Sequence, residues 1–147
     1  METRLLFAAK FGELEAQYAR LEQRFALCRT GDRESVRREC DLLADECMAW
    51  ENTLSAQVNG GRSKAVEALA FAQLSYSRRL RQIMENDLPR FLHSEAEDNG
   101  AEGAALYAEY ALDAAAQAMR HALMAALYAT GLQMDAKQNE ATEEVPE

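Results

Sequence analysis

The two histidines come first in a search for chemistry, because helical bundles build di-metal sites from Glu on two helices and Glu-x-x-His on the other two. Three residues before His93 stands Arg90, and three residues before His121 stands Ala118. The motif is therefore missing at both histidines. The chain also lacks a glycine-rich phosphate loop, a nucleophile elbow and a Ser/His/Asp arrangement. We expect no metal, no cofactor, no catalytic residue and no enzymatic activity.

The three cysteines, Cys28, Cys40 and Cys47, include no CxxC pair, and the last two stand seven residues apart. A redox or zinc site needs closer pairs. Each cysteine occupies an apolar position of a helical stripe, where free cysteine behaves as a small apolar side chain. We therefore expect three buried, unreactive thiols. Their odd number, and an apolar run at Leu5–Ala9 too short for a signal peptide, predict a cytoplasmic protein.

Arginines gather in one part of an otherwise acidic chain. Arg78, Arg81 and Arg90 fall within residues 62–92, which carry six basic and three acidic side chains, whereas the whole chain has a net charge of −9. A basic patch with aromatic neighbours is typical of nucleic-acid-binding surfaces. This cluster is small, and the acidic residues elsewhere offer it partners. We expect these arginines to form salt bridges within or between subunits, and a nucleic-acid-associated accessory factor is the weaker alternative.

Three aromatic side chains are candidates for a small-ligand pocket. Tyr107 and Tyr110 lie near the start of the apolar last helix, and Trp50 lies on the second. Tyrosines at the end of a bundle commonly pack with their rings buried and their hydroxyls in water. Two interpretations therefore remain, simple packing of these rings or a ligand pocket formed by Trp50, Tyr107 and Tyr110. On the second interpretation the protein would be a ligand-binding or sensor bundle, which is the alternative function.

Apolar side chains repeat at intervals of three and four along two long stretches, which predicts helices that each bury one stripe. The members of the two stripes are Phe7, Phe11, Leu14, Tyr18, Leu21, Phe25 and Cys28, then Val36, Cys40, Leu43, Cys47, Trp50 and Leu54. A tight turn at residues 30–32 makes the two helices antiparallel neighbours. Folding about Gly31 would place Phe25 near Cys40 and Leu14 near Trp50, so we expect the stripes to pack along their whole length.

Helix boundaries follow from the capping residues. The first helix is expected to end at Arg29, with Gly31 in the left-handed C′ conformation and Asp32 capping the second helix. The glycines at 60 and 61 close the second helix, and Ser63 is expected to cap the third.

The third helix is expected to end or kink at Pro89, because proline has no N–H and its ring clashes with the preceding turn. Leu88 is disfavoured in the α region by the proline after it, and Asp87 could cap a new short helix. The last helix should run from about Ala101 to near Lys137.

That last helix is rich in alanine and apolar on most of its circumference. Its expected length of ~50 Å or more exceeds the ~40 Å of the other three helices, so one end should overhang or meet another subunit. The surplus of apolar surface predicts self-association, most simply as a homodimer. Ala115 or Ala122, whichever faces outward, would lie in the interface. No window holds ~18 uncharged apolar residues, so we expect no membrane-spanning helix.

Together these patterns predict an all-α fold, an antiparallel four-helix bundle of long helices with coiled-coil packing and a break near Pro89. Residues 1–138 are expected to form a single domain, and residues 139–147 a disordered acidic tail. The leading hypothesis for function is a non-enzymatic interaction or scaffold bundle that forms homo-oligomers and presents helix surfaces to a protein partner.

Overall fold

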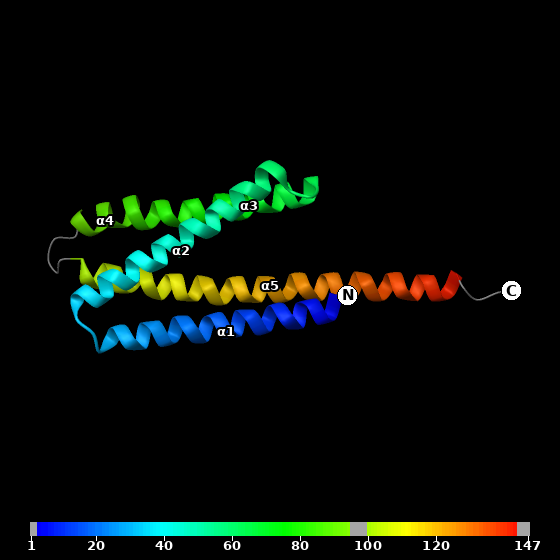
Figure 1. The fold of residues 1–147 in the computed structure, drawn as a ribbon, viewed down its shortest axis with the longest axis horizontal. Coiled ribbons are helices and arrows are strands. Elements are labelled where there is room, and N and C mark those ends of the chain that lie inside the picture. Colours follow the sequence, from blue (N-terminus) through cyan, green and yellow to red (C-terminus); the bar gives the residue numbers. More distant parts are fainter. Residues whose placement is uncertain (1–2, 95–99, 144–147) are drawn as a thin grey trace. The chain divides into compact units, whose positions relative to one another are not determined.

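The computed structural model describes residues 3–94 and 100–143. Within them the chain is helical and has no strand, which confirms the predicted all-α class. The elements, shown in Figure 1, are α1 (Thr3–Arg29), α2 (Arg33–Gly60), α3 (Lys64–Gln82), the π-helical turn η1 (Ile83–Asp87), α4 (Leu88–Ser94) and α5 (Ala101–Glu143). No helix in these two ranges is long and apolar enough to cross a membrane.

The chain divides into two compact units. The terminal unit combines Met1–Leu21 with Ala105–Glu147, and the central unit is Glu22–Ala104. The terminal unit therefore contains most of α1 and α5, and the central unit contains α2, α3, η1 and α4. The single domain predicted for residues 1–138 stays a prediction.

The turn between α1 and α2 confirms Asp32 as the cap of α2. Its backbone is extended, and its carboxylate accepts a hydrogen bond from the backbone N–H of Ser35 at 2.8 Å. The prediction of a left-handed Gly31 is wrong, because Gly100 is the glycine with positive φ among the described residues. Instead, the N–H of Gly31 donates to the carbonyl of Cys28 at 3.2 Å, and this four-residue turn closes α1 without the left-handed conformation.

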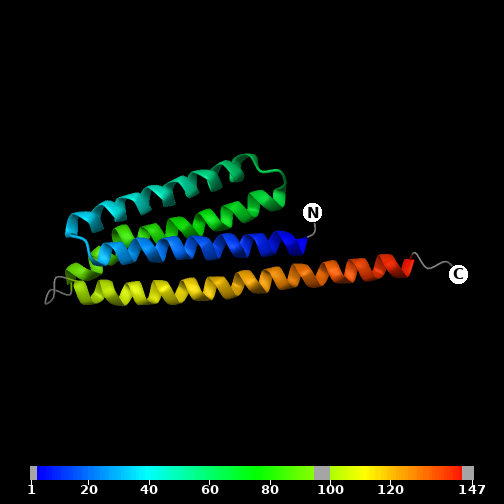
Figure 2. The same cartoon turned by 60° about the horizontal axis from the view of Figure 1, so that its bottom comes forward.

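In the central unit α2 and α3 form an antiparallel hairpin, which Figure 2 shows side by side. Ser63 caps α3 as predicted, accepting a hydrogen bond from the backbone N–H three residues later at 3.2 Å. Between the helices lie Leu54, Ala70 and Leu74, each 4% exposed, with Val58 packed against them. Full burial of a leucine stabilises a fold by about 1.5–3 kcal/mol, so these side chains hold the hairpin together.

The predicted break near Pro89 takes the form of the π turn η1. The N–H of Leu88 donates to the carbonyl of Ile83, five residues back. This wider turn immediately precedes Pro89, whose ring would clash with the carbonyl that a regular α-helix places four residues back. The prediction that Leu88 leaves the α region is wrong. A short helix does begin directly after Asp87, since α4 starts at Leu88, and capping of α4 by Asp87 stays a prediction. Leu88 has φ −66° and ψ −49°, so the chain stays helical across the proline.

The last helix, α5, begins at Ala101 as predicted. Gly100 before it has φ +79°, and a Cβ atom at this position would lie 3.0 Å from Cβ of Leu92. Positive φ and close approach both favour glycine here.

At its other end α5 continues to Glu143, past the predicted end near Lys137. It therefore includes residues 139–143 of the predicted disordered tail, and residues 144–147 lie outside the described residues. Glu140, Ala141 and Glu143 in this stretch are good helix formers, which explains why the polar sequence remains helical.

Part of the predicted stripes is exposed. Cys40 and Cys47 are exposed and Cys28 is half-buried, so the prediction of three buried thiols is wrong. In the central unit Phe25 is 68% exposed, so it is not packed into a core beside Cys40. Cys40 and Cys47 lie on the face of α2 that also carries Glu51 and Leu54, but nearer the start of the helix. Among the described residues α2 packs against α3 and not against η1 or α4, so the hairpin core covers Leu54 and leaves the start of α2 open.

The predicted pairing of Leu14 with Trp50 joins the two units. Leu14 belongs to the terminal unit, and Trp50 belongs to the central unit. This pairing therefore stays a prediction.

Candidate functional site

The terminal unit contains an apolar cavity of about 420 Å³ between α1 and α5. Its lining is Phe7, Lys10, Phe11 and Leu14 from α1 and Ala122, Ala125 and Ala126 from α5. Large side chains on α1 face alanines on α5, and the methyl groups of alanine are too short to fill the space between the two helices. The result is a hollow that an apolar group from outside could occupy.

Among the described residues that line this cavity, Lys10 is the charged one. Its ammonium Nζ lies 3.8 Å from Oε2 of Glu13, one turn along α1, and both side chains are well exposed. An exposed pair at this distance contributes little to stability. The ammonium group is therefore available at the rim of the cavity for an anionic group.

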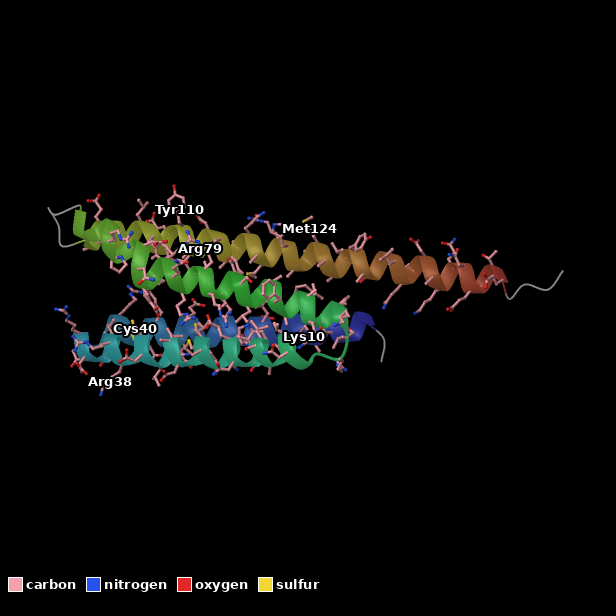
Figure 3. The ribbon with its side chains drawn as sticks, turned by 90° about the horizontal axis from the view of Figure 1, so that it is seen from above. Lys10, Arg38, Cys40, Arg79, Tyr110 and Met124 are labelled. Carbon is pink, nitrogen blue, oxygen red and sulfur yellow. The ribbon has the colours of Figure 1, made fainter. Side chains whose placement is uncertain are left out.

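Ala122, Ala125 and Ala126 mark the face of α5 that is turned toward α1. About a third of a turn around the helix from this face, Leu123, Leu127 and Met134 form a stripe. These side chains are 47%, 61% and 48% exposed, respectively. Figure 3 shows Tyr110 and Met124 projecting together from one side of α5. The helix has no buried residue among those described.

The exposed stripe lies within a stretch of α5 that carries no charge. This uncharged segment runs over Ala122–Met134, with Arg120 and His121 before it and Asp135 after it. Its Thr130 hydroxyl donates to the carbonyl of Ala126 at 2.8 Å, so this polar atom has a partner within the helix. The segment therefore presents mainly apolar side chains outward.

A polar network connects α2 and α3 beside the hairpin core. Glu51 is 5% exposed, and its Oε1 accepts a hydrogen bond from the hydroxyl of Ser77 at 3.0 Å. Its Oε2 lies 3.3 Å from Nη2 of Arg81. Nε of Arg81 is buried without a hydrogen-bond partner among the described residues. A buried carboxylate needs such partners, so the network fixes how α2 and α3 face each other.

A second ion pair joins the end of α1 to α2 inside the central unit. Nη1 of Arg24 lies 3.0 Å from Oε2 of Glu46, and its Nε donates to Glu39. Hydrogen bonds to Glu46 and Glu39 raise the pKa of Arg24 further above its ordinary value. The charged guanidinium therefore links the end of α1 to α2 across the turn.

The structure places the predicted aromatic pocket residues in both units. Tyr107 is half-buried and Tyr110 is 69% exposed in the terminal unit, whereas Trp50 is 56% exposed in the central unit. None of the three lines the cavity between α1 and α5. A pocket formed by Trp50, Tyr107 and Tyr110 stays a prediction.

The predicted arginine cluster is partly committed to internal partners. Arg81 pairs with Glu51, and the neighbouring Arg79 places Nη1 3.2 Å from Oδ2 of Asp87. Arg78 and Arg90 are exposed.

No group of three or more His, Cys, Asp or Glu side chains that could hold a metal ion occurs in the part of the chain that the structure describes.

Of the two alanines predicted in an interface, Ala122 lines the cavity and Ala115 is exposed. The outward apolar side chains are larger residues of the same helix, which sequence reasoning described only as general apolarity. Sequence reasoning also missed Glu51, although its spacing of three to Leu54 and seven to Val58 puts it on the face of α2 that packs against α3.

Comparisons with protein-family models, curated proteins and solved structures found no significant match.

Proposed function

We propose that the protein is a non-enzymatic interaction or scaffold protein that self-associates through α5. The observation that supports this proposal is the state of α5, a helix of 43 residues with no buried residue among those described. Most of its large apolar side chains expose half or more of their area. They are Leu106, Tyr110, Leu112, Met119, Met124, Leu127, Tyr128 and Leu132. An apolar patch of more than a few hundred Å² on a protein surface usually marks an interface.

The energies involved are sufficient for a stable pair. Association costs about 4–15 kcal/mol in lost freedom, and burying one large apolar side chain returns about 1.5–3 kcal/mol when complete. A two-fold pair counts each residue twice, so burial of four or five of the exposed apolar side chains of α5 named above is of the order of this cost. A homodimer is the commonest closed assembly.

For the arrangement of the helices we propose an antiparallel four-helix bundle. In the central unit α2 and α3 pack as an antiparallel pair, and in the terminal unit α1 and α5 run in opposite directions and line one cavity (Figure 2). Large apolar residues of α3 such as Leu69 and Phe71 are 68% and 60% exposed, as expected of faces that a bundle would cover. The three free thiols support a reducing compartment, so we propose a cytoplasmic location.

Sedimentation of the full chain at tens of micromolar, the range of weak-dimer affinities, tests the proposal. We expect a dimer for the wild type and a folded, helical monomer for Leu127→Glu, because the new carboxylate would lose its hydration in the interface. Leu27→Glu is the matched control, since Leu27 on α1 is 67% exposed and Leu127 is 61% exposed. A monomeric wild type would refute self-association.

The cavity between α1 and α5 supports a second candidate function, the binding of a small apolar ligand with an anionic group. Its volume of about 420 Å³ falls within the range of small-molecule sites, roughly 300–1,000 Å³. Phe7, Phe11 and Leu14 would contact the apolar part, and Lys10 would attract the anion.

Calorimetric titration with a medium-chain fatty acid tests this second candidate. Binding should be lost in Ala126→Leu, which fills the cavity, and should persist in Ala115→Leu, which changes the same helix outside the lining. Lys10→Gln should weaken binding and reduce its dependence on salt. Equal binding by the wild type and Ala126→Leu would exclude the cavity as the site.

A further inference from the structure

The charges at the two ends of the uncharged segment specify how two copies of α5 could meet. Arg120 precedes the segment and Asp135 follows it, and both are exposed. We infer that two copies pair through Ala122–Met134 in antiparallel orientation, with the two-fold axis beside the middle of the segment near Leu127 and Tyr128. This inference rests on the proposed self-association through α5 and names its partner, a second copy of this chain.

Charge complementarity selects the antiparallel orientation. With the axis near the middle of the segment, the end that carries Arg120 lies beside the end of the second copy that carries Asp135. A parallel pair would place Arg120 beside the same arginine and Asp135 beside the same aspartate. Like charges repel, and parallel helix dipoles side by side add to that repulsion. Nη1 of Arg120 donates to Oε1 of Gln117 at 3.1 Å, which leaves a five-donor guanidinium able to contact a carboxylate as well.

The spacing of the stripe suits a helix partner. Arg120, Leu123, Leu127, Thr130 and Met134 follow at intervals of three, four, three and four, which is the repeat that two packed helices use. Gly131 lies inside the same segment, and a Cβ atom built there would meet no atom within 4 Å. A helix interior disfavours glycine, and its small size allows a second backbone to approach closely.

Charge reversal tests the orientation. In an antiparallel dimer, Arg120→Asp alone or Asp135→Arg alone creates two repulsive contacts and should weaken self-association about fivefold or more at low salt. The double variant exchanges the two charges and should restore the wild-type affinity to within about twofold. In a parallel dimer each single change only replaces one pair of like charges by another pair of like charges, so the affinity of dimerisation would stay the same. Arg20→Asp, an exposed change on α1, is the control for net charge.

Disulfide trapping provides an independent measurement. In a variant with serine at positions 28, 40 and 47, Leu127→Cys should cross-link two copies readily, because this residue lies near the axis. Asp135→Cys should not cross-link with itself, since its two copies would lie roughly 20 Å apart along the helices. It should cross-link when mixed with Arg120→Cys.

The outcomes separate the two proposals. A wild type that sediments as a monomer overturns self-association itself. The same monomer would result if helices of the same chain covered Leu127. A dimer in which Asp135→Cys cross-links with itself, or in which single charge reversals have no effect, overturns only the antiparallel orientation. If the cysteine-free variant fails to fold, the charge-reversal series in the natural background decides the orientation.

Discussion

Nη2 of Arg81 on α3 lies 3.3 Å from Oε2 of Glu51 on α2. The hydroxyl of Ser77 donates to the other oxygen of the same carboxylate at 3.0 Å, so both oxygens have partners. The side chain of Glu51 is 6% exposed, whereas that of Arg81 is 39% exposed. The carboxylate is thus the desolvated member of the pair, and it depends on both partners.

Removal of this carboxylate should destabilise the hairpin. Glu51→Ala leaves Ser77 and Arg81 without their acceptor, and an unsatisfied buried polar group costs about 1–3 kcal/mol. Urea unfolding should show a loss of this size, and Asp45→Ala, an exposed acidic residue on the same helix, should stay within about 0.5 kcal/mol. Adding Arg81→Met to Glu51→Ala should cost less than the two single changes summed. Equal small losses for Glu51→Ala and Asp45→Ala would contradict the network.

Leu74 should dominate the stability of the hairpin core. It is 4% exposed beside Leu54, whereas Leu69 on the same helix is 68% exposed. Leu74→Ala should reduce the free energy of unfolding by about 2–5 kcal/mol, because it leaves a cavity. Leu69→Ala removes the same atoms from a side chain in water and should cost about 0.5 kcal/mol or less. Similar losses at both positions would mean that another element covers Leu69.

Local signals in the sequence predicted the ends of the helices well. Asp32 and Ser63 cap α2 and α3 because a short acceptor side chain before a helix satisfies a backbone N–H wherever the helix packs. The left-handed Gly31 was predicted from glycine's preference, but the turn closes by a hydrogen bond to Cys28 that any residue could make. The response of the chain to Pro89 depends on whether one extra residue can be absorbed in a π turn, which no local preference decides.

The faces that helices turn to each other were harder to predict. The apolar stripe on α2 contains Trp50 and Leu54, which suggested that both face the same neighbour. In the structure α2 packs Leu54 against α3 together with the charged Glu51. A pattern of apolar residues does not show that a buried acid has an arginine on the next helix, because that pairing is a tertiary contact. The cavity lined by Ala122 was missed for the same reason, since alanine fits any face of a helix.

Acid should weaken the start of α2 through Asp32. The pKa of this carboxyl lies below its usual value of 3.8, first because it accepts the backbone N–H of Ser35 and second because it accepts the Ser35 hydroxyl. A carboxyl with a lowered folded pKa stabilises the fold above its unfolded pKa, and this contribution is lost as the pH falls through the folded pKa. The stability advantage of the wild type over Asp32→Asn, which keeps a neutral acceptor, should therefore be present at pH 7 and shrink below about pH 4. Urea unfolding at a series of pH values measures it, and a constant difference from pH 7 to pH 2 would contradict this role of the charge.

Two of the three thiols should react quickly in the native protein. Cys40 and Cys47 are exposed on α2, and Cys28 is half-buried near the end of α1. The rate of thiol reagents depends on access to the sulfur, so titration with a chromogenic disulfide should show two fast equivalents and a slower third. Cys40→Ser and Cys47→Ser should each remove one fast equivalent, and Cys28→Ser should remove the slow one. Three slow thiols that become fast in denaturant would contradict this result, because they would show that another helix closes over the face of α2 that carries Cys40 and Cys47.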